Sequence, residues 1–187
     1  MAKPDTGGKV QVYTGNGKGK TTCALGLGMR AAGHGLEVLM ISFMKAKVAE
    51  RSGTNEVNYG EFKTIEQIPK FTIIPVGRES FVDKDNPDPV DIEMAQNGLK
   101  MAQNALAEHK CDVLILDEIN VAVEWNLISL TDQLGLIKMK PADVEIVMTG
   151  RYASEEIIEA ADLVTEMKEI KHYFETKKIL ARRGFEF

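Results

Sequence analysis

The sequence predicts an α/β fold in which a mostly parallel β-sheet carries helices on both faces within a single domain. Apolar stretches of strand length alternate along the chain with stretches of helical periodicity, the pattern of a parallel sheet crossed by helices. A glycine-rich loop follows the first apolar stretch, at the edge where such sheets bind ligands. The 187 residues suffice for one domain with a sizeable core. We expect residues 1–8 to form a flexible tail and residues 9–187 to form the domain.

Short apolar runs predict the strands. Residues 37–43 (EVLMISF) are almost continuously apolar, as expected of a strand that is buried on both faces. Residues 71–76 (FTIIPV) form another candidate, which Pro75 weakens because proline lacks the hydrogen-bond donor of the ladder. In chain order, strands are expected at residues 9–14, 37–43, 71–76, 113–116, 145–149 and 163–167.

Apolar residues at helical spacing predict the helices between these strands. The first helix begins at Thr21, directly after the glycine-rich loop, and ends at His34, where glycines on both sides mark the boundary. Ser154 is the expected N-cap of a later helix that runs to about Ala161. In chain order, helices are expected at residues 21–34, 90–109, 130–139 and 154–161.

The overall charge argues against some classes of partner. The net charge is −5 and the isoelectric point is about 5.3, whereas nucleic-acid-binding surfaces are usually basic. The longest strongly apolar stretch, residues 38–44, is too short to span a membrane, and the polar N-terminus lacks the apolar core of a signal peptide. We therefore expect a cytoplasmic protein without nucleic-acid or membrane partners. The acidic balance leaves room for a local basic pocket, for which the candidates are Lys18, Lys20, Lys45, Lys47, Arg51, Arg78 and Arg151.

The chain has only two cysteines, Cys23 and Cys111. Neither has the spacing of a metal ligand. We expect both to be buried thiols in a reducing cytosol.

The glycine-rich loop has the composition of a polyphosphate-binding site. It reads Gly15, Asn16, Gly17, Lys18, Gly19, Lys20, Thr21 and Thr22. Alternate glycines allow the main-chain N–H groups to approach phosphate oxygens, and the following helix directs its N-terminal dipole at the same anion. Lys20 adds a positive charge, and the hydroxyl of Thr21 can bind Mg²⁺. The loop is one residue shorter than the Walker A pattern G-x-x-x-x-G-K-[ST], because Thr14 stands where the first glycine is expected.

Two later strand ends carry polar residues that can reach the same edge of the sheet. Asp117 and Glu118 follow an apolar run in a Walker B-like arrangement and can hold Mg²⁺ opposite Thr21. Glu118 could instead be the base that activates water, as in hydrolytic ATPases, and a plain surface carboxylate pair is the structural alternative. Arg151 follows the next apolar strand and can bind phosphate, although a surface charge beside a helix explains its position equally well.

Several sequence blocks together resemble the P-loop type of corrinoid adenosyltransferase. They are TGNGKGKTT (14–22), RAAGHG (30–35), FMK (43–45), LDEIN (116–120), TGR (149–151), ADLVTEM (161–167), KH (171–172) and RGFEF (183–187). The resemblance covers nearly the whole chain, and the ordered set of blocks is more specific than the phosphate loop alone. It implies a P-loop NTPase-like, RecA-like fold.

The resemblance also implies an activity. Members transfer the 5′-deoxyadenosyl group of Mg-ATP to the Co(I) centre of a reduced corrinoid, such as cob(I)alamin or cob(I)yrinic acid a,c-diamide. They release triphosphate and act in adenosylcobalamin biosynthesis or salvage. They bind ATP with the triphosphate reversed relative to other P-loop proteins, and the short loop agrees with this. A homodimer and a flavoprotein reductant are further expectations.

By the same resemblance, roles fall on particular residues of this chain. Lys20, Thr21 and Glu118 carry the reaction, and Thr21, Glu118 and Asp117 hold Mg²⁺. The loop, with Asn16 and Arg151, contacts the nucleotide. The family usually has an F-x-W pair that helps to displace the lower axial ligand of the corrinoid. The counterpart here, residues 77–81, has no tryptophan, so Phe81 is the candidate replacement.

Two other functions remain open from the sequence. The first is a P-loop ATPase or phosphotransferase that acts on a different small molecule and yields ADP. The second is a binding module that senses ATP or a corrinoid without turnover. The identity of the phosphate product separates the first of these from the transferase.

Overall fold

A single parallel sheet forms the centre of the molecule. The computed structural model describes residues 7–46 and 59–187, and all strand pairings among these residues are parallel. The strand order is β3-β2-β4-β5-β1-β6. The strands are β1 (Val10–Thr14), β2 (Val38–Phe43), β3 (Phe71–Val76), β4 (Val113–Asp117), β5 (Glu145–Thr149) and β6 (Leu163–Glu166).

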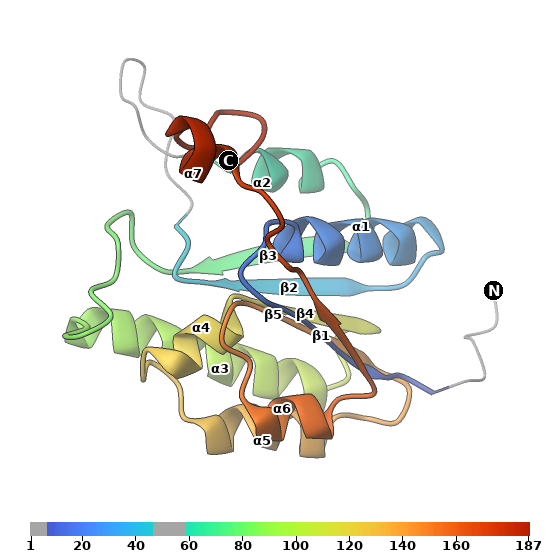
Figure 1. Cartoon of the computed structure of the whole chain (residues 1–187). Helices are drawn as coiled ribbons and strands as arrows, with labels where there is room; N and C mark the ends of the chain where they lie inside the picture. The colour runs from blue at the N-terminus through green and yellow to red at the C-terminus, as the bar shows by residue number, and fades with distance from the viewer. Residues whose placement is uncertain (1–6, 47–58) are drawn as a thin grey trace.

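Helices cover both faces of this sheet. Helices α1 and α2 lie on one face and α3, α4, α5 and α6 on the other, and α7 stands near α2 at the carboxyl end of the chain (Figure 1). The helices are α1 (Lys20–Gly33), α2 (Gly60–Ile65), α3 (Pro89–Ala107), α4 (Ile119–Glu124), α5 (Leu130–Met139), α6 (Glu155–Ala160) and α7 (Tyr173–Lys177). The predicted α/β fold with a mostly parallel sheet, helices on both faces and one domain is therefore confirmed.

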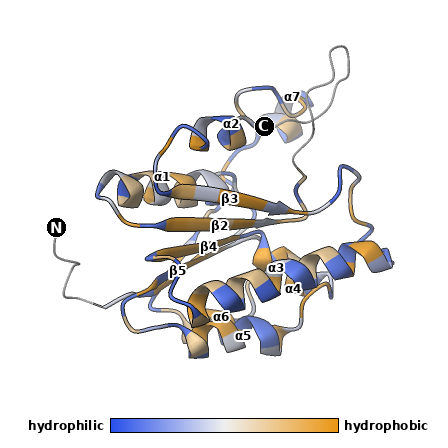
Figure 2. Ribbon diagram, turned by 180° about the vertical axis from the view of Figure 1, so that it is seen from behind, coloured by the Kyte–Doolittle hydropathy of each residue, from blue (hydrophilic) through white to orange (hydrophobic). Residues whose placement is uncertain are grey.

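The core consists of two apolar layers, one on each side of the sheet. Strand β4 is buried at every residue, and Figure 2 shows the central strands as apolar ribbons between the two helical layers. The larger cluster joins the sheet to the helices on the side of α3, and the smaller cluster joins it to α1. Helix α3 approaches the sheet closely at Gly98, where a Cβ atom would lie 2.7 Å from Val76 and 2.9 Å from Phe43.

The strands and long helices lie where the sequence predicts them, with ends that differ by one or two residues. Helix α6, although only six residues long, also lies where it is predicted, because its N-cap Ser154 marks its start. The short helices α2, α4 and α7 are additional, because five or six residues without such a predicted start are too few to display a helical period. The expectation for one cysteine is wrong. Cys111 is buried, but Cys23 is exposed, because the buried face of α1 runs through Ala24, Gly28 and Ala32.

Some sequence expectations fall on residues outside the described ranges. They are residues 1–6 of the expected tail and the basic candidates Lys47 and Arg51. At the start of the described chain, the N–H of Gly8 donates to the carbonyl of Ala142 at 2.7 Å. No helix in the described ranges combines the length and the apolarity that a membrane span requires.

Candidate functional site

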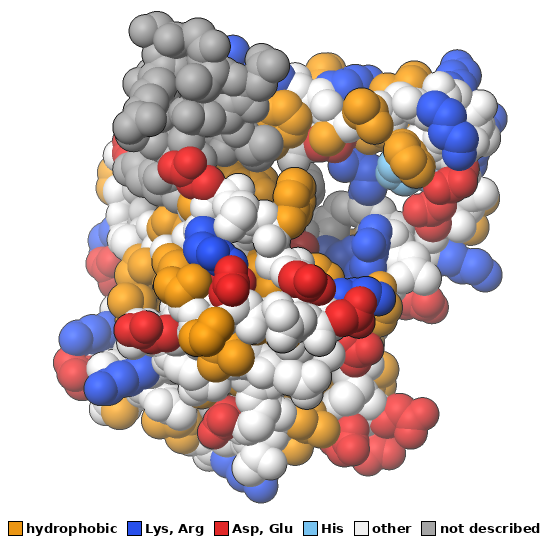
Figure 3. Space-filling model, turned by 90° about the vertical axis from the view of Figure 1, so that its left-hand side faces the viewer, with side chains coloured by type: hydrophobic (Ala, Val, Ile, Leu, Met, Phe, Trp, Pro, Cys, Tyr) orange, Lys and Arg blue, Asp and Glu red, His pale blue; other side chains and the backbone are white. Residues whose placement is uncertain are grey.

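The candidate site lies at the carboxyl edge of the sheet. The phosphate loop (residues 15–22) follows β1, Asp117 ends β4 and Thr149 ends β5, so parallel strands bring all three to one edge. Figure 3 views the molecule from this side and shows a hollow in which Lys and Arg side chains gather.

Two left-handed glycines shape the phosphate loop, and the end of β6 supports it. Gly15 and Gly19 have φ angles of 93° and 113°, which favour glycine over other residues. The N–H of Gly17 donates to the carbonyl of Met167 at 2.6 Å, and a Cβ atom on Gly17 would lie 2.7 Å from that oxygen. Glycine at position 17 therefore allows the loop to pack against the segment that follows β6.

Lys20 lies inside this loop. Its Nζ donates to the carbonyl oxygens of Gly15 and Gly17, both at 2.8 Å, and the residue is 8% exposed. Burial lowers the pKa of the amine, because the charged form loses hydration. The loop thus holds a cation at its centre, directed at the place where a polyphosphate would bind.

Asp117 is a fully buried carboxylate with a partner on each oxygen. Its Oδ1 accepts hydrogen bonds from the hydroxyls of Thr21 at 2.8 Å and Thr149 at 2.7 Å. Its Oδ2 accepts from Nζ of Lys45 at 2.7 Å. Burial opposes the charge of Lys45, but the charge and hydrogen bond of Asp117, together with the charges of Glu118 and Glu61, outweigh this effect and raise the pKa of Lys45. Asp117 thus holds the first turn of α1 against the ends of β4 and β5.

Glu118 adopts a different orientation. Its φ angle is 62°, and its N–H donates to the hydroxyl oxygen of Thr149 at 3.0 Å. Burial and the neighbouring Asp117 raise the pKa of its carboxyl group, although Lys45, Lys20 and Arg151 oppose the shift. Among the described residues, the Glu118 carboxylate has no hydrogen bond or ion pair. It is therefore available to a ligand.

The site suits Mg²⁺ bound together with phosphates. No group of three or more His, Cys, Asp or Glu side chains within residues 7–46 and 59–187 could hold a metal ion by itself. Mg²⁺ typically takes one or two protein oxygens and completes its shell with water and phosphate oxygens. The Thr21 hydroxyl and the unpaired Glu118 carboxylate fit this requirement, whereas both oxygens of Asp117 already have protein partners.

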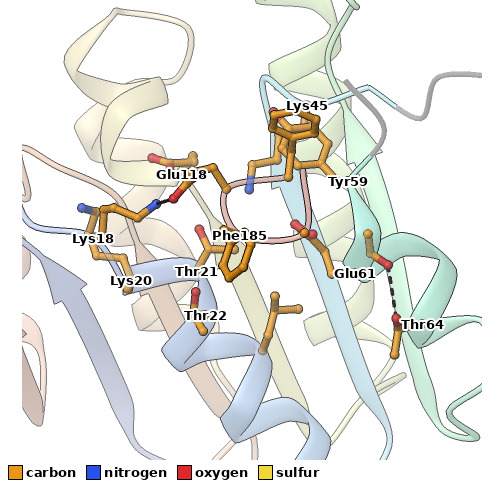
Figure 4. A pocket seen from close by; sticks show the side chains of 16 residues that line it. Lys18, Lys20, Thr21, Thr22, Lys45, Tyr59, Glu61, Thr64, Glu118 and Phe185 are labelled. Atoms are coloured by element: carbon orange, nitrogen blue, oxygen red, sulfur yellow. Dashed lines mark hydrogen bonds and ion pairs between the residues drawn. The ribbon is translucent and has the colours of Figure 1, made fainter. Parts of the chain in front are cut away.

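Two cavities meet at this site. The first cavity, of about 580 Å³, lies between residues 18–22, residues 59–61 with Thr64, and the carboxy-terminal residues 184–187. Figure 4 shows Phe185 between the phosphate loop on one side and Lys45, Tyr59 and Glu61 on the other.

The second cavity, of about 650 Å³, lies between residues 43–46, residues 78–82 and residues 121, 125, 151 and 152. Five residues line both cavities: Lys18, Lys20, Lys45, Tyr59 and Glu118. The two cavities therefore lie next to one another, with these residues between them.

The structure divides the predicted site residues between these cavities. Lys18 to Thr22 line the first, while Asn16, Gly17, Phe81 and Arg151 line the second. Phe81 is completely exposed at the rim of the second cavity. The guanidinium of Arg151 donates to the carbonyl of Asn16 at 3.5 Å, so it reaches the loop as expected. Gly15 lines neither cavity and instead faces Glu166 and Met167.

Sequence reasoning missed three contributors to the site. Lys45 appears there only as a basic candidate and within the block FMK, without a role, yet it contacts Asp117 because β2 pairs with β4 in a register that sets Ser42 beside Asp117. Thr149 was visible only as part of the block TGR. The carboxy-terminal wall has no local signal except the block RGFEF, whose position beside the loop depends on tertiary structure.

Comparison with known proteins identifies the family. Residues 6–187 match the family model described as "ATP:corrinoid adenosyltransferase BtuR/CobO/CobP". The chain belongs to this family. The corrinoid adenosyltransferase of Pseudomonas aeruginosa is 35% identical over 98% of this chain and 85% of its own. That of a Sinorhizobium species is 34% identical over 99% and 83%, and that of Escherichia coli K12 is 31% identical over 91% and 82%.

Solved structures agree with the fold of this adenosyltransferase family member. The flagellar accessory protein FlaH of Methanocaldococcus jannaschii superposes with a TM-score of 0.54 over 86% of this chain and 71% of its own. At 18% identity, this likeness concerns the fold alone. It agrees with the P-loop NTPase-like architecture that the sequence predicts.

Proposed function

We propose that this chain transfers the 5′-deoxyadenosyl group of Mg-ATP to the Co(I) centre of a reduced corrinoid. One observation carries the proposal beyond family membership: a cavity at the phosphate loop adjoins a second cavity, and Lys20, Lys45 and Glu118 line both. Such an arrangement allows ATP and an acceptor to bind side by side. The ribose of the nucleotide then lies near these residues, and the triphosphate lies on the loop.

The reaction requires little covalent chemistry from the protein. Cobalt(I) donates its electron pair to C5′ of the ribose, the C5′–O bond breaks, and triphosphate leaves with that bonding pair. The protein must hold the two reactants in line and stabilise the charge on the leaving group. We assign the second task to Lys20 and Lys18, which line the first cavity, and to the N–H groups of the loop.

Binding of triphosphate changes the partners of Lys20. Without triphosphate, its Nζ donates to two loop carbonyls. Phosphate oxygens would replace these carbonyls as acceptors, because a hydrogen bond to an anion is stronger than one to a neutral carbonyl. A bound Mg²⁺ neutralises phosphate charge. Thr21 and Glu118 would hold it, and Asp117 would orient Thr21 through their 2.8 Å hydrogen bond.

The second cavity suits an acceptor with a broad apolar surface. Phe43, Trp125 and Tyr152 line it, and Phe81 stands at its rim. Large aromatic side chains contribute apolar contact with a defined geometry, which fits the flat ring of a corrinoid. We assign the corrinoid to this cavity on these grounds.

The test is an anaerobic assay with Mg-ATP and chemically reduced cob(I)alamin, followed by its absorbance spectrum and by identification of the phosphate product. We expect an adenosylcobalamin spectrum and free triphosphate. Lys20→Ala should abolish both, while Lys70→Ala should change neither, because Lys70 pairs with Glu37 on the surface away from both cavities. ADP and phosphate without a new cobalt–carbon bond would instead identify an ATPase that uses Glu118 as its base.

Four finer features belong to the same proposal: a requirement for Mg²⁺, a homodimer, a flavoprotein reductant and a cytoplasmic location. The family resemblance supports the first three, and the sequence supports the fourth. Chelation of divalent ions should stop turnover, and sedimentation of the purified chain should give twice its mass of 20.7 kDa.

A further inference from the structure

The carboxy-terminal turn (residues 182–187) is a wall of the first cavity. Its N–H groups at Phe185 and Glu186 both donate to the carbonyl of Arg182, at 3.2 and 3.0 Å, and the N–H of Gly184 donates to the carbonyl of Phe187 at 2.7 Å. These bonds form a compact turn. Gly184 to Phe187 then face residues 18–22 of the phosphate loop across the cavity.

Glu186 is the centre of this turn. Its Oε1 accepts from the hydroxyl of Tyr173, and its Oε2 accepts from the backbone N–H of Arg182 at 2.6 Å. The guanidinium of Arg182 also donates to this carboxylate, at 3.3 and 3.4 Å, and lies over the rings of Tyr173 and Phe185. The hydrogen bonds from Tyr173 and Arg182 lower the pKa of Glu186 to about 2, so it is ionised at neutral pH.

The same carboxylate contacts the phosphate loop. Nζ of Lys18 lies 3.4 Å from Oε1 of Glu186, and the Glu186 side chain is only 12% exposed. Figure 4 shows Lys18 on the rim of the first cavity with its ion pair drawn as a dashed line. Lys18 also lines the second cavity, so it lies between the two cavities.

The cations of the site each have an internal acceptor. Lys20 uses carbonyls of its own loop, and Lys45 uses the fully buried Asp117. The acceptor of Lys18 differs from these two. It is Glu186, a carboxylate near the end of the chain, and Glu186 itself lines the cavity. When triphosphate enters this cavity, one of the lysines that could bind it, Lys18, is already paired with a carboxylate.

We propose that Glu186 competes with triphosphate for Lys18 and so lowers the affinity of the site for the triphosphate that the reaction releases. This inference rests on the proposed function, since it takes triphosphate as the product. Tyr173 and Arg182 hold Glu186 in place when Lys18 turns to a phosphate, so the competing carboxylate stays beside the site. The ion pair between Glu186 and Lys18 then forms again as triphosphate leaves. A site of several lysines and Mg²⁺ would otherwise retain a polyanion tightly.

The test measures binding of inorganic triphosphate with Mg²⁺ to the full chain by titration calorimetry. Glu186→Gln removes the charge but keeps an oxygen that can accept hydrogen bonds from Tyr173 and Arg182. We expect it to tighten binding about two- to fivefold, the range of a partly exposed ion pair. Glu175→Gln is the matched control. It makes the same charge change in α7, where Glu175 pairs only with Lys178 among the described residues, and should leave binding unchanged.

A double-mutant cycle tests whether Lys18 transmits the effect. In a Lys18→Met background, the gain from Glu186→Gln should fall to less than half. If more than half of the tightening by Glu186→Gln persists in that background, Glu186 acts by direct repulsion of triphosphate and the proposal is overturned. Unchanged or weaker triphosphate binding in Glu186→Gln itself would also overturn it. Glu186→Asp, whose shorter side chain withdraws the carboxylate from Lys18, provides a second variant for which tighter binding is also expected, should the first fail to fold. Failure of the unsubstituted chain to bind triphosphate would overturn the proposed function and this inference together.

Discussion

Replacement of Lys45 by methionine tests whether burial sets the strength of the ion pair with Asp117. The two atoms lie 2.7 Å apart, with side-chain exposures of 13% and 0%. At an effective dielectric constant of about 20, unit charges at this distance attract by about 6 kcal/mol, and desolvation offsets part of this gain. Lys45→Met leaves a buried carboxylate without its cation, a change that costs about 3–5 kcal/mol. A loss of about 4 kcal/mol lowers the urea midpoint by about 2 M when m is about 2 kcal/mol per M.

Lys70→Met is the matched control for this prediction. Lys70 and Glu37 lie at 2.9 Å, nearly the same distance, but their side chains are 46% and 53% exposed. In surroundings close to water, with a dielectric constant of about 80, the attraction at this distance is about 1.4 kcal/mol. Side-chain ordering reduces the net value to about 0–1 kcal/mol. Equal losses in the two variants, or a loss below about 1 kcal/mol in Lys45→Met, would refute the argument from burial.

Three further predictions concern the described residues. A maleimide should label the exposed Cys23 and leave Cys111 unlabelled in the native protein up to pH 9. Burial raises the pKa of the Cys111 thiol to about 11, so little reactive thiolate forms there, and mass spectrometry of peptides distinguishes the two cysteines. Gly98→Ala should destabilise by about 1–3 kcal/mol in urea, since its Cβ would lie 2.7 Å from Val76. Gly135→Ala, also helical but with open space around it, should stabilise by up to about 1 kcal/mol, and the same sign in both variants would contradict the packing argument.

The central strands were predictable because they are buried on both faces. Every residue of β4 is buried and only one of β2 is partly exposed, so their sequences are apolar almost throughout. The phosphate loop was predictable for a different reason, since its glycines and lysines stand close together in a recognisable sequence pattern. Both features can be read from a short stretch of sequence.

The missed residues depend on contacts between distant segments. Lys45 meets Asp117 only because β2 and β4 are neighbours in the sheet, and the sequence does not state which strands pair. Cys23 was misplaced because α1 buries a narrow stripe of small residues, Ala24, Gly28 and Ala32, rather than its larger apolar ones. Glu186 lies beside Lys18 through the path of the chain after β6, which no periodicity encodes.

The hydrogen bond between Gly17 and Met167 also bears on the synthesis of the protein. Within the described part of the chain, the partners of strand β1 are β5 and β6, and the loop that follows β1 is supported by the segment after β6. At roughly 5–20 residues per second, a ribosome needs roughly 8–30 s to add the 150 residues that separate Gly17 from Met167. Until β5 is made, strand β1 has neither of these neighbours, and until Met167 is made the loop lacks its support. Nucleotide can therefore stabilise the chain only after Met167 has left the ribosome. The phosphate loop is thus translated early but reaches its folded form late.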